Sequence, residues 1–250
     1  MSATLSIRGL SVNYGGVQAV DDVDITVEPS TIVGLIGPNG AGKTTTIDAV
    51  TGFTPSRGHV ELDGNLLDAM SAHERARRGL VRTFQSVELF DDLSVHQNLG
   101  VAAMPSRWWS PLIDAVAPKR GRSIDVDWAL EAVGLGSLGD AHPPDLSHGQ
   151  RRLVALARAL VAKPKVLLLD EPAAGLDTDE TGALGRLLQT LPERGIGVLL
   201  IDHDMSLVLS VCSHVVVLDF GRVIAAGSPS DIRRDPSVIA AYLGRNEDAS

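Results

Sequence analysis

The sequence predicts an α/β protein with a mainly parallel sheet core, an N-terminal antiparallel β-subdomain and an inserted helical subdomain. Between Ile32 and Leu218, apolar runs typical of buried strands alternate with helical stretches, the pattern of a parallel sheet covered by helices. Residues 5–27 instead alternate apolar and polar positions around a Gly15-Gly16 turn, which indicates short antiparallel strands. From about residue 89 to 146 strand signals vanish and helical segments broken by prolines dominate, which indicates the helical insertion.

The individual elements follow from local signals. Short apolar runs predict buried strands, and apolar residues at helical spacing predict helices. We expect strands at 32–36, 58–62, 166–169, 197–201 and 215–218, and helices at 44–50, 71–79, 149–161, 178–191 and 205–212. Residues 228–243 predict two helical pieces, and Pro236 is placed to start the second because proline fits the first turn of a helix.

Composition limits the function classes. The 250 residues are 44% hydrophobic and 21% charged, which is an ordinary globular balance. The net charge of −9 argues against a main role in holding nucleic acid, because phosphate backbones require a basic surface. The single cysteine, Cys212, predicts a buried apolar side chain, with no disulfide framework and no zinc cluster. We see no signal peptide and no window of 18 apolar residues, so we expect a cytoplasmic chain.

The most specific motif is the glycine-rich run GPNGAGKTT at 37–45, which directly follows the apolar strand 32–36. A strand, a glycine-rich loop and a helix in this order form a phosphate-binding loop, and the sequence therefore predicts a P-loop NTPase. Backbone N–H groups of about residues 40 to 45 should surround phosphate oxygens, supported by the helix dipole. Lys43 should reach the β- and γ-phosphates, and the Thr44 hydroxyl should bind Mg²⁺. The expected nucleotide-binding residues here are Gly37, Asn39, Gly40, Ala41, Gly42, Lys43, Thr44 and Thr45.

A second motif is the apolar strand at 166–169, which ends in the carboxylates of Asp170 and Glu171. Ligands bind at the carboxyl ends of such strands. We expect Asp170 to orient Mg²⁺ or its waters, and Glu171 to polarise the water that attacks the phosphate. An ordinary acidic strand end would look the same in isolation, but the phosphate-binding loop upstream favours the catalytic interpretation.

The third motif is LSHGQ at 146–150, which begins the helix 149–161. Ser147 and Gln150 form an S-x-x-Q capping box, which would start a helix for purely local reasons. A capped helix start with a glycine is also an anion site, and here it would face a phosphate bound to another subunit. The two interpretations do not conflict.

Together, GPNGAGKT, LSHGQ and LLLDEP, with Gln85 and His203 in their places in the chain, resemble the ATP-binding-cassette ATPases. The resemblance covers essentially the whole chain. His148 replaces the more usual glycine of LSGGQ, at a position that varies in the family. The resemblance implies ATP and Mg²⁺ as cofactors, and two subunits paired head to tail. Ser147, Gly149 and Gln150 of one subunit would then hold the ATP that lies in the loop of the other.

Further roles come from this resemblance. Tyr14 matches the aromatic residue that stacks on adenine, and Val20 the apolar contact beside it, although Tyr14 would also fit as a packed strand aromatic. Gln85 matches the glutamine that reaches Mg²⁺, and Asp177 lies in the AGLD loop that crosses the dimer interface. His203 matches the switch histidine that contacts the γ-phosphate. The implied catalytic residues are Glu171 and His203, and the implied metal-binding residues are Thr44, Gln85 and Asp170.

The domain expectation is a single ABC ATPase domain over 1–250. Its ATP-binding core would take about 1–88 and 160–226, its helical subdomain about 89–159, and its C-terminal helical tail 227–250.

Four stretches resemble the branched-chain amino acid importer ATPases: RTFQ at 82–85, PAAGLD at 172–177, IDHDM at 201–205 and PSVIAAYLG at 236–244. The implied function is ATP hydrolysis that powers solute import, with separate transmembrane permease subunits and a second ABC ATPase (itself or a paralogue) as partners, a solute-binding protein as an indirect one, and no nucleic acid. The chain would sit peripherally on the cytoplasmic side of the cell membrane. Importers of urea or short amides and the lipopolysaccharide-export ATPases remain alternatives, and so does a soluble ATPase outside transport.

Two groups of residues are open to more than one interpretation. Trp108-Trp109 and Leu112-Ile113 would either contact the permease or pack the helical subdomain. The basic groups are expected to be solvated, with anionic lipid as a lesser alternative. They are Arg75, Arg77 and Arg78, and Lys119, Arg120 and Arg122. A non-hydrolysing regulatory module is also an alternative, against which Glu171 and His203 argue.

Overall fold

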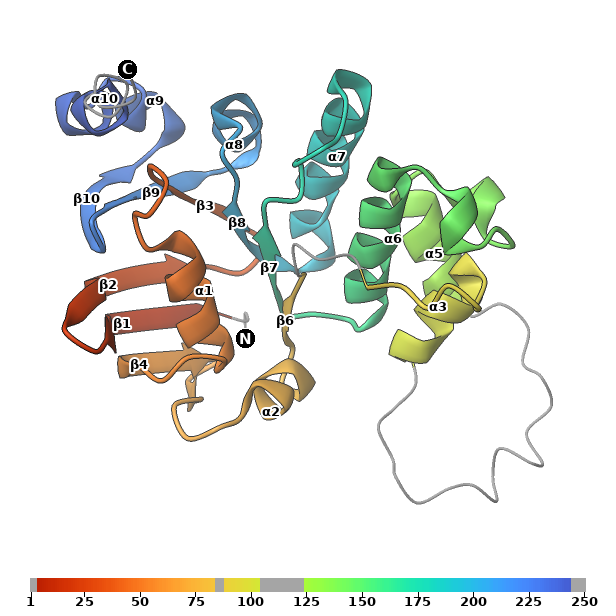
Figure 1. The fold of residues 1–250 in the computed structure, drawn as a ribbon, viewed down its shortest axis with the longest axis horizontal. Helices are drawn as coiled ribbons and strands as arrows, with labels where there is room; N and C mark the ends of the chain where they lie inside the picture. Colours follow the sequence, from red (N-terminus) through yellow and green to blue (C-terminus); the bar gives the residue numbers. More distant parts are fainter. Residues whose placement is uncertain (1–3, 84–87, 104–123, 244–250) are drawn as a thin grey trace. The chain divides into compact units, whose positions relative to one another are not determined.

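The structure is a computed structural model, and it describes residues 4–83, 88–103 and 124–243 of the chain. The chain divides into two compact units (Figure 1). Unit 1 comprises Met1–Gln85, Pro164–Ala174 and Leu184–Ser250, and unit 2 comprises Ser86–Lys163 and Gly175–Ala183. Each unit is described by itself.

The first sheet of unit 1 is antiparallel and has the strand order β2-β1-β4-β5. Its strands are β1 (Leu5–Tyr14), β2 (Val17–Val27), β4 (Arg57–Leu62) and β5 (Asn65–Leu66). The sequence predicts that apolar and polar residues alternate along this strand, and β1 shows that burial pattern. Its apolar side chains point into the core at every second position over most of its length. The N-terminal antiparallel subdomain is therefore confirmed.

The second sheet of unit 1 has the order β10-β9-β3-β8-β7-β6 and is parallel except for the β10–β9 pair. Its strands are β3 (Ile32–Ile36), β6 (Leu80–Arg82), β7 (Val166–Asp170), β8 (Gly197–Ile201), β9 (His214–Asp219) and β10 (Arg222–Gly227). Strands β3, β7 and β8 are buried at every position, which is why they read as continuous apolar runs. The mainly parallel core is confirmed, whereas β6 and β10, the edge strands, had no predicted counterpart.

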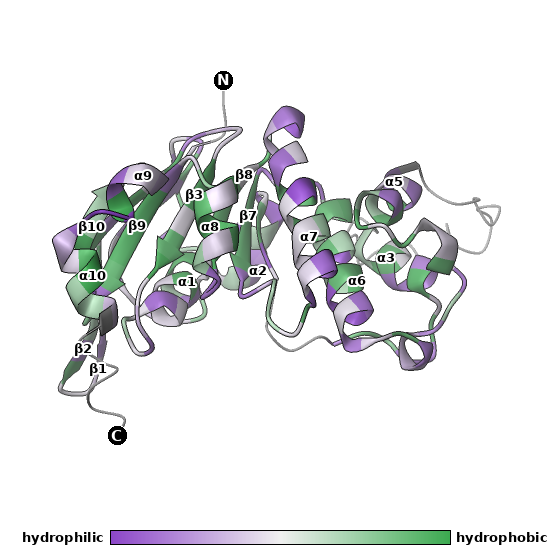
Figure 2. Cartoon of the chain, turned by 90° about the horizontal axis from the view of Figure 1, so that it is seen from above, coloured by the Kyte–Doolittle hydropathy of each residue, from purple (hydrophilic) through white to green (hydrophobic). Residues whose placement is uncertain are grey.

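The core of unit 1 lies between its two sheets, around helix α1 (Lys43–Thr51). Ile47, Ala49 and Val50 of α1 share one buried cluster with residues of both sheets. Helix α8 (Met205–Val211) packs on β3 at Gly34, where a Cβ would lie 2.8 Å from a methyl group of Val208. Figure 2 shows the hydrophobic residues concentrated in strands β3, β7, β8 and β9. The C-terminal pieces, α9 (Pro229–Ile232) and α10 (Pro236–Leu243), confirm the two predicted helices.

Unit 2 is helical. It contains α3 (Val95–Ala103), α5 (Ile124–Ala132), α6 (His148–Val161) and the short 3-10 turns Gly136–Leu138 and Pro143–Asp145. Helix α6 packs against both α3 and α5 with an apolar face that includes Val154, Ala157 and Val161. Helix α7 (Thr178–Thr190) begins in unit 2 and ends in unit 1. Within the described ranges, the helices are too short or too polar for any of them to cross a bilayer.

Helix α2 (Ala72–Arg77) corrects one expectation. Arg75 was expected on a solvated face, but it is only 5% exposed. Its guanidinium donates hydrogen bonds to the carbonyl oxygens of Ala49 and Val50 at 3.0 and 2.7 Å, in the last turn of α1, and to that of Met70 at 3.1 Å. A cation is favourable there because carbonyls at a helix C-terminus lack partners and carry partial negative charge. Arg77 and Arg78 are exposed, as expected.

Candidate functional site

The phosphate-binding loop connects β3 to α1 and depends on its glycines. Gly37 has φ 151°, and a Cβ there would lie 2.1 Å from the carbonyl oxygen of Leu218 in β9. Gly42 has φ 103°, and its Cβ would lie 2.6 Å from the carbonyl oxygen of Ala19. Both positions exclude a side chain by backbone conformation and by space. Ala41 is fully buried, whereas Asn39 and Gly40 are exposed on the loop.

Lys43 and the threonines open helix α1 at the end of the loop. The Lys43 ammonium donates to the carbonyl oxygens of Gly37 and Pro38 at 2.7 and 2.9 Å, so it is held within the loop. Thr44 is exposed and Thr45 is half-buried. Thr46 is buried and donates its hydroxyl to the carbonyl oxygen of Gly42 at 2.9 Å, which ties the helix start to the loop.

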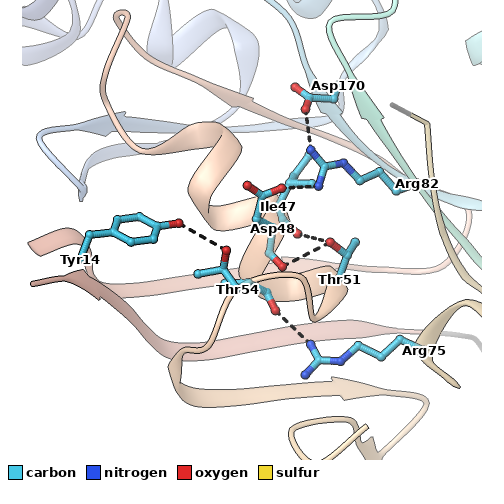
Figure 3. Close-up of polar contacts among 9 residues, drawn as sticks. Tyr14, Ile47, Asp48, Thr51, Thr54, Arg75, Arg82 and Asp170 are labelled. Carbon is cyan, nitrogen blue, oxygen red and sulfur yellow. Dashed lines mark hydrogen bonds and ion pairs between the residues drawn. The ribbon is translucent and has the colours of Figure 1, made fainter. Parts of the chain in front are cut away.

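Asp170, at the end of β7, forms a charge network with Arg82 and Asp48 (Figure 3). The Arg82 guanidinium forms an ion pair with Asp170 Oδ2 at 2.9 Å and another with the Asp48 carboxylate of α1. Asp170 Oδ1 is buried and has no hydrogen-bond partner among the residues that the structure describes. Such an oxygen fits a hard cation, because Mg²⁺ prefers carboxylate and hydroxyl oxygens. The donors available therefore fit the expected metal.

Glu171 follows β7 in a left-handed backbone conformation, with φ 49°. Such a conformation is uncommon outside glycine and must be held by surrounding contacts. The Glu171 N–H donates to the carbonyl oxygen of Ile201 at 2.8 Å, which attaches this turn to the end of β8. Two residues on, the Ala173 N–H donates to the buried Asp202 carboxylate at 3.0 Å.

His203 lies directly after β8, beside the same anchor. Its side chain is 65% exposed, and its Nδ1 lies 3.5 Å from Asp202 Oδ1. That oxygen also accepts the Asp204 N–H at 2.9 Å. Asp204 then caps α8 through the N–H groups of Ser206 and Leu207. Asp202 thus holds both the turn after Glu171 and the segment that carries His203.

The two residues expected at adenine differ in exposure. Tyr14 is 52% exposed at the end of β1, and its hydroxyl lies 3.3 Å from the Thr54 Oγ1 (Figure 3). Its ring therefore offers a surface on which a base can stack. Val20 is fully buried in the core of unit 1, and its side chain packs near Gly42 of the loop. Of the expected pair, Tyr14 is the residue that exposes its side chain.

In unit 2, the LSHGQ segment begins α6 as the capping box predicts. The Ser147 hydroxyl accepts the Gln150 N–H at 3.1 Å, and the Gln150 side chain accepts the Ser147 N–H at 2.9 Å. Gly149 is buried, and a Cβ there would lie 2.5 Å from a carboxylate oxygen of Glu180. The same carboxylate accepts the Asp177 N–H at 3.1 Å, and Asp177 accepts the Glu180 N–H at 2.8 Å.

Sequence reasoning did not single out several residues of these sites. Arg82, Asp48, Asp202 and Glu180 were given no role of their own, because their ion pairs and hydrogen bonds join segments that are distant in the chain or depend on the folded turn, and no local pattern shows them. Gln85 lies outside the described residues, as do the proposed permease contacts and the second basic group. These residues are Trp108, Trp109, Leu112, Ile113, Lys119, Arg120 and Arg122.

The fold and unit 1's site define the class of protein. A phosphate-binding loop follows the first buried parallel strand, and a second strand of the same sheet ends in Asp170 and Glu171. This combination is that of a P-loop ATPase.

Comparisons with known proteins identify the family. Residues 20–174 match the family described as "ABC transporter", and residues 222–248 match the family described as "Branched-chain amino acid ATP-binding cassette transporter". The chain is 41% identical to the high-affinity branched-chain amino acid transport ATP-binding protein BraF of Pseudomonas aeruginosa, and 40% identical to LivG of Escherichia coli K12. Both alignments cover 96% of this chain and 97% of the relative. The lipopolysaccharide export system ATP-binding protein LptB of Escherichia coli K12 is 38% identical, over 98% of both chains.

Comparisons with solved structures lead to the same family. An ATP-binding cassette of an ABC transporter superposes with a TM-score of 0.84 at 30% identity, covering 97% of this chain and 99% of that one. The ADP conformation of such a cassette superposes with a TM-score of 0.81, covering 98% and 100%. The chain therefore belongs to the ABC transporter family, and it is an ATP-binding and ATP-hydrolysing cassette of that family.

Proposed function

We propose that this chain hydrolyses ATP, with Mg²⁺, to power the import of branched-chain amino acids through separate membrane subunits. The observation that carries the choice of solute is the match of residues 222–248 to the branched-chain amino acid cassettes. This segment forms β10, α9 and α10, outside the nucleotide-binding motifs that all ABC ATPases share. The similarity to BraF and LivG over nearly the whole chain supports the same choice.

In the proposed reaction each residue has a role. The loop amides and Lys43 bind the phosphates, and Tyr14 stacks on adenine. Glu171 accepts a proton from the attacking water, and His203 contacts the γ-phosphate. Thr44, Gln85 and Asp170 would hold Mg²⁺, which neutralises charge on the phosphate oxygens when bound. The exposed Tyr14 ring, the buried Asp170 oxygen and the anchored turn at Glu171 support these roles.

The other half of each site would come from a second cassette, either another copy or a paralogue. Ser147, Gly149 and Gln150 of one subunit would contact the ATP of the other, and Asp177 would lie at the interface. The capped start of α6 supports this role because N–H groups at a helix start attract phosphate. The permeases, with a solute-binding protein outside, would place the chain on the cytoplasmic face of the membrane.

The test begins with the tagged chain, isolated from detergent-solubilised membranes of its own cells. Mass spectrometry should recover two polytopic permeases and a second cassette ATPase. Leucine uptake by those cells should stop when Glu171 is replaced by Gln and continue when the exposed Glu193 is replaced by Gln. Recovery of no membrane protein, or leucine uptake that Glu171→Gln leaves unchanged, would contradict the proposal.

Lipopolysaccharide export is the second candidate, because LptB is 38% identical over 98% of this chain. The same isolation separates the two candidates. An exporter would copurify with its lipopolysaccharide-handling membrane subunits, and the Glu171→Gln variant would fail in lipopolysaccharide delivery rather than in leucine uptake. Urea uptake by the same cells tests the remaining importer alternative.

A further inference from the structure

Arg82 connects three parts of unit 1 that the expected metal site uses. It ends β6, which pairs in parallel with β7 and places Arg82 opposite Leu168. From there the guanidinium bonds Asp170 Oδ2 on β7 and the Asp48 carboxylate on α1. Asp48 follows Thr44 by four positions, and therefore lies on the same face of α1 as that hydroxyl.

Because these groups are largely buried, the Asp170 carboxylate needs a positively charged partner, and Arg82 provides it. The side chain of Asp170 is 1% exposed and that of Arg82 is 8% exposed, whereas that of Asp48 is 30% exposed. A buried carboxylate without a partner is costly, and the ion pair with Arg82 offsets part of the cost of burying Asp170. The pairing occupies only Oδ2, and Oδ1 remains buried without a hydrogen-bond partner among the described residues.

The three groups have a definite net charge. One guanidinium and two carboxylates sum to −1. A divalent cation at Asp170 Oδ1 is attracted by both carboxylates and repelled by Arg82. The guanidinium therefore opposes metal binding by the protein alone, and the phosphates of a bound nucleotide would add the missing negative charge.

We propose that Arg82 is a positioning residue, which holds Asp170 through Oδ2, leaves Oδ1 for the metal, and keeps metal affinity low until the nucleotide binds. This role rests on the proposed function, in which Asp170 contacts Mg²⁺. Because of this role of Arg82, the metal would bind together with the nucleotide rather than before it. Asp48 has the opposite effect, because its carboxylate offsets part of the Arg82 charge.

The test measures binding of Mn²⁺, a spectroscopic substitute for Mg²⁺, to the full-length chain without nucleotide, by electron paramagnetic resonance. Arg82→Gln raises the net negative charge of the cluster from −1 to −2, and we expect it to bind Mn²⁺ about tenfold more tightly. Asp48→Asn lowers it to 0, and we expect weaker binding, by about threefold because Asp48 is partly solvated. Arg82→Lys keeps the charge, so its Mn²⁺ affinity should match that of the original chain.

The rate of ATP turnover distinguishes the positioning role of Arg82 from the effect of its charge. Lysine cannot bridge two carboxylates as the planar guanidinium does, so Arg82→Lys should lower kcat while leaving Mn²⁺ affinity unchanged. A purely structural role for Arg82 would lower stability without tightening metal binding. The inference would be overturned if Arg82→Gln and Asp48→Asn bound Mn²⁺ with the same affinity as the original chain. If Arg82→Gln does not fold, the opposite shift in Asp48→Asn and the unchanged affinity of Arg82→Lys still decide it.

Asp170→Asn distinguishes this inference from the proposed function. If that variant binds Mn²⁺ as well as the original chain, Asp170 is not a metal contact and the proposed metal site fails. If Asp170→Asn weakens binding while Arg82→Gln and Asp48→Asn have no effect, the metal site stands and only the role of Arg82 is wrong.

Discussion

Replacing Arg75 by alanine tests whether the C-terminus of α1 depends on a buried cation. The guanidinium makes hydrogen bonds of 3.0, 2.7 and 3.1 Å to the carbonyl oxygens of Ala49, Val50 and Met70, at 5% exposure. A net hydrogen bond to a charged group contributes about 1.5–3 kcal/mol. The loss of these hydrogen bonds is offset in part, because alanine also removes a charge whose burial is costly. The same burial lowers the pKa of Arg75. We therefore expect a loss of about 3 kcal/mol in the free energy of unfolding.

The measurement is thermal unfolding of the full-length chain, followed by circular dichroism. For a protein of this size, about 3 kcal/mol corresponds to a fall of roughly 6–12 °C in Tm. Arg77→Ala is the matched control, since Arg77 lies in the same helix and is exposed. That variant should change the free energy of unfolding by about 0.5 kcal/mol or less. The reasoning is refuted if the two variants unfold at the same temperature.

Three further predictions concern the site and its surroundings. Glu171→Gln should lower kcat by about 10²–10⁴-fold while ATP still binds, as measured by phosphate release and nucleotide binding, with Glu193→Gln unchanged as the control. Gly37→Ala should abolish nucleotide binding because its Cβ would meet a backbone carbonyl at 2.1 Å. Gly100→Ala, in α3 and with no atom within 4 Å of its Cβ, should retain nucleotide binding, and equal affinities of the two variants would contradict this. Burial raises the pKa of Cys212 from 9.0 to about 12, so a thiol reagent should leave the folded chain unlabelled at pH 8, and the stability that the protonated thiol contributes should be lost progressively between pH 9 and 12.

The fold was largely predictable because its strands and helices have strong local patterns. Strands β3, β7 and β8 are buried throughout and stand out as apolar runs. The edge strands are different. Strand β10 is exposed or half-buried at every position, and β6 has only three residues, so neither produces an apolar run. Their pairing with β9 and β7 decides that they are strands, and pairing between distant segments is not visible in a local pattern.

The motifs predicted which residues would form the site, but not what holds each of their segments in place. The turn at Glu171 is attached by a hydrogen bond to Ile201, thirty positions later in the chain. The contact of Glu180 with Gly149 likewise joins the starts of two different helices of unit 2. Such contacts depend on the completed fold. The expected roles in catalysis and metal binding rest on the family resemblance and stay predictions.

Counted over the whole residue, the buried charged residues in the described part of the chain are Arg75, Asp170 and Asp202. Composition predicts charged residues at the surface, because burying a charge is costly unless it is paired and hydrogen-bonded. Each of the three meets that condition differently: Arg75 with carbonyls of α1, Asp170 with the Arg82 guanidinium, and Asp202 with the N–H groups of Ala173 and Asp204. All three act on segments that carry or adjoin the phosphate-binding loop, Glu171 or His203. The cost of burying charge is therefore concentrated where the chain must hold its expected catalytic groups in fixed positions.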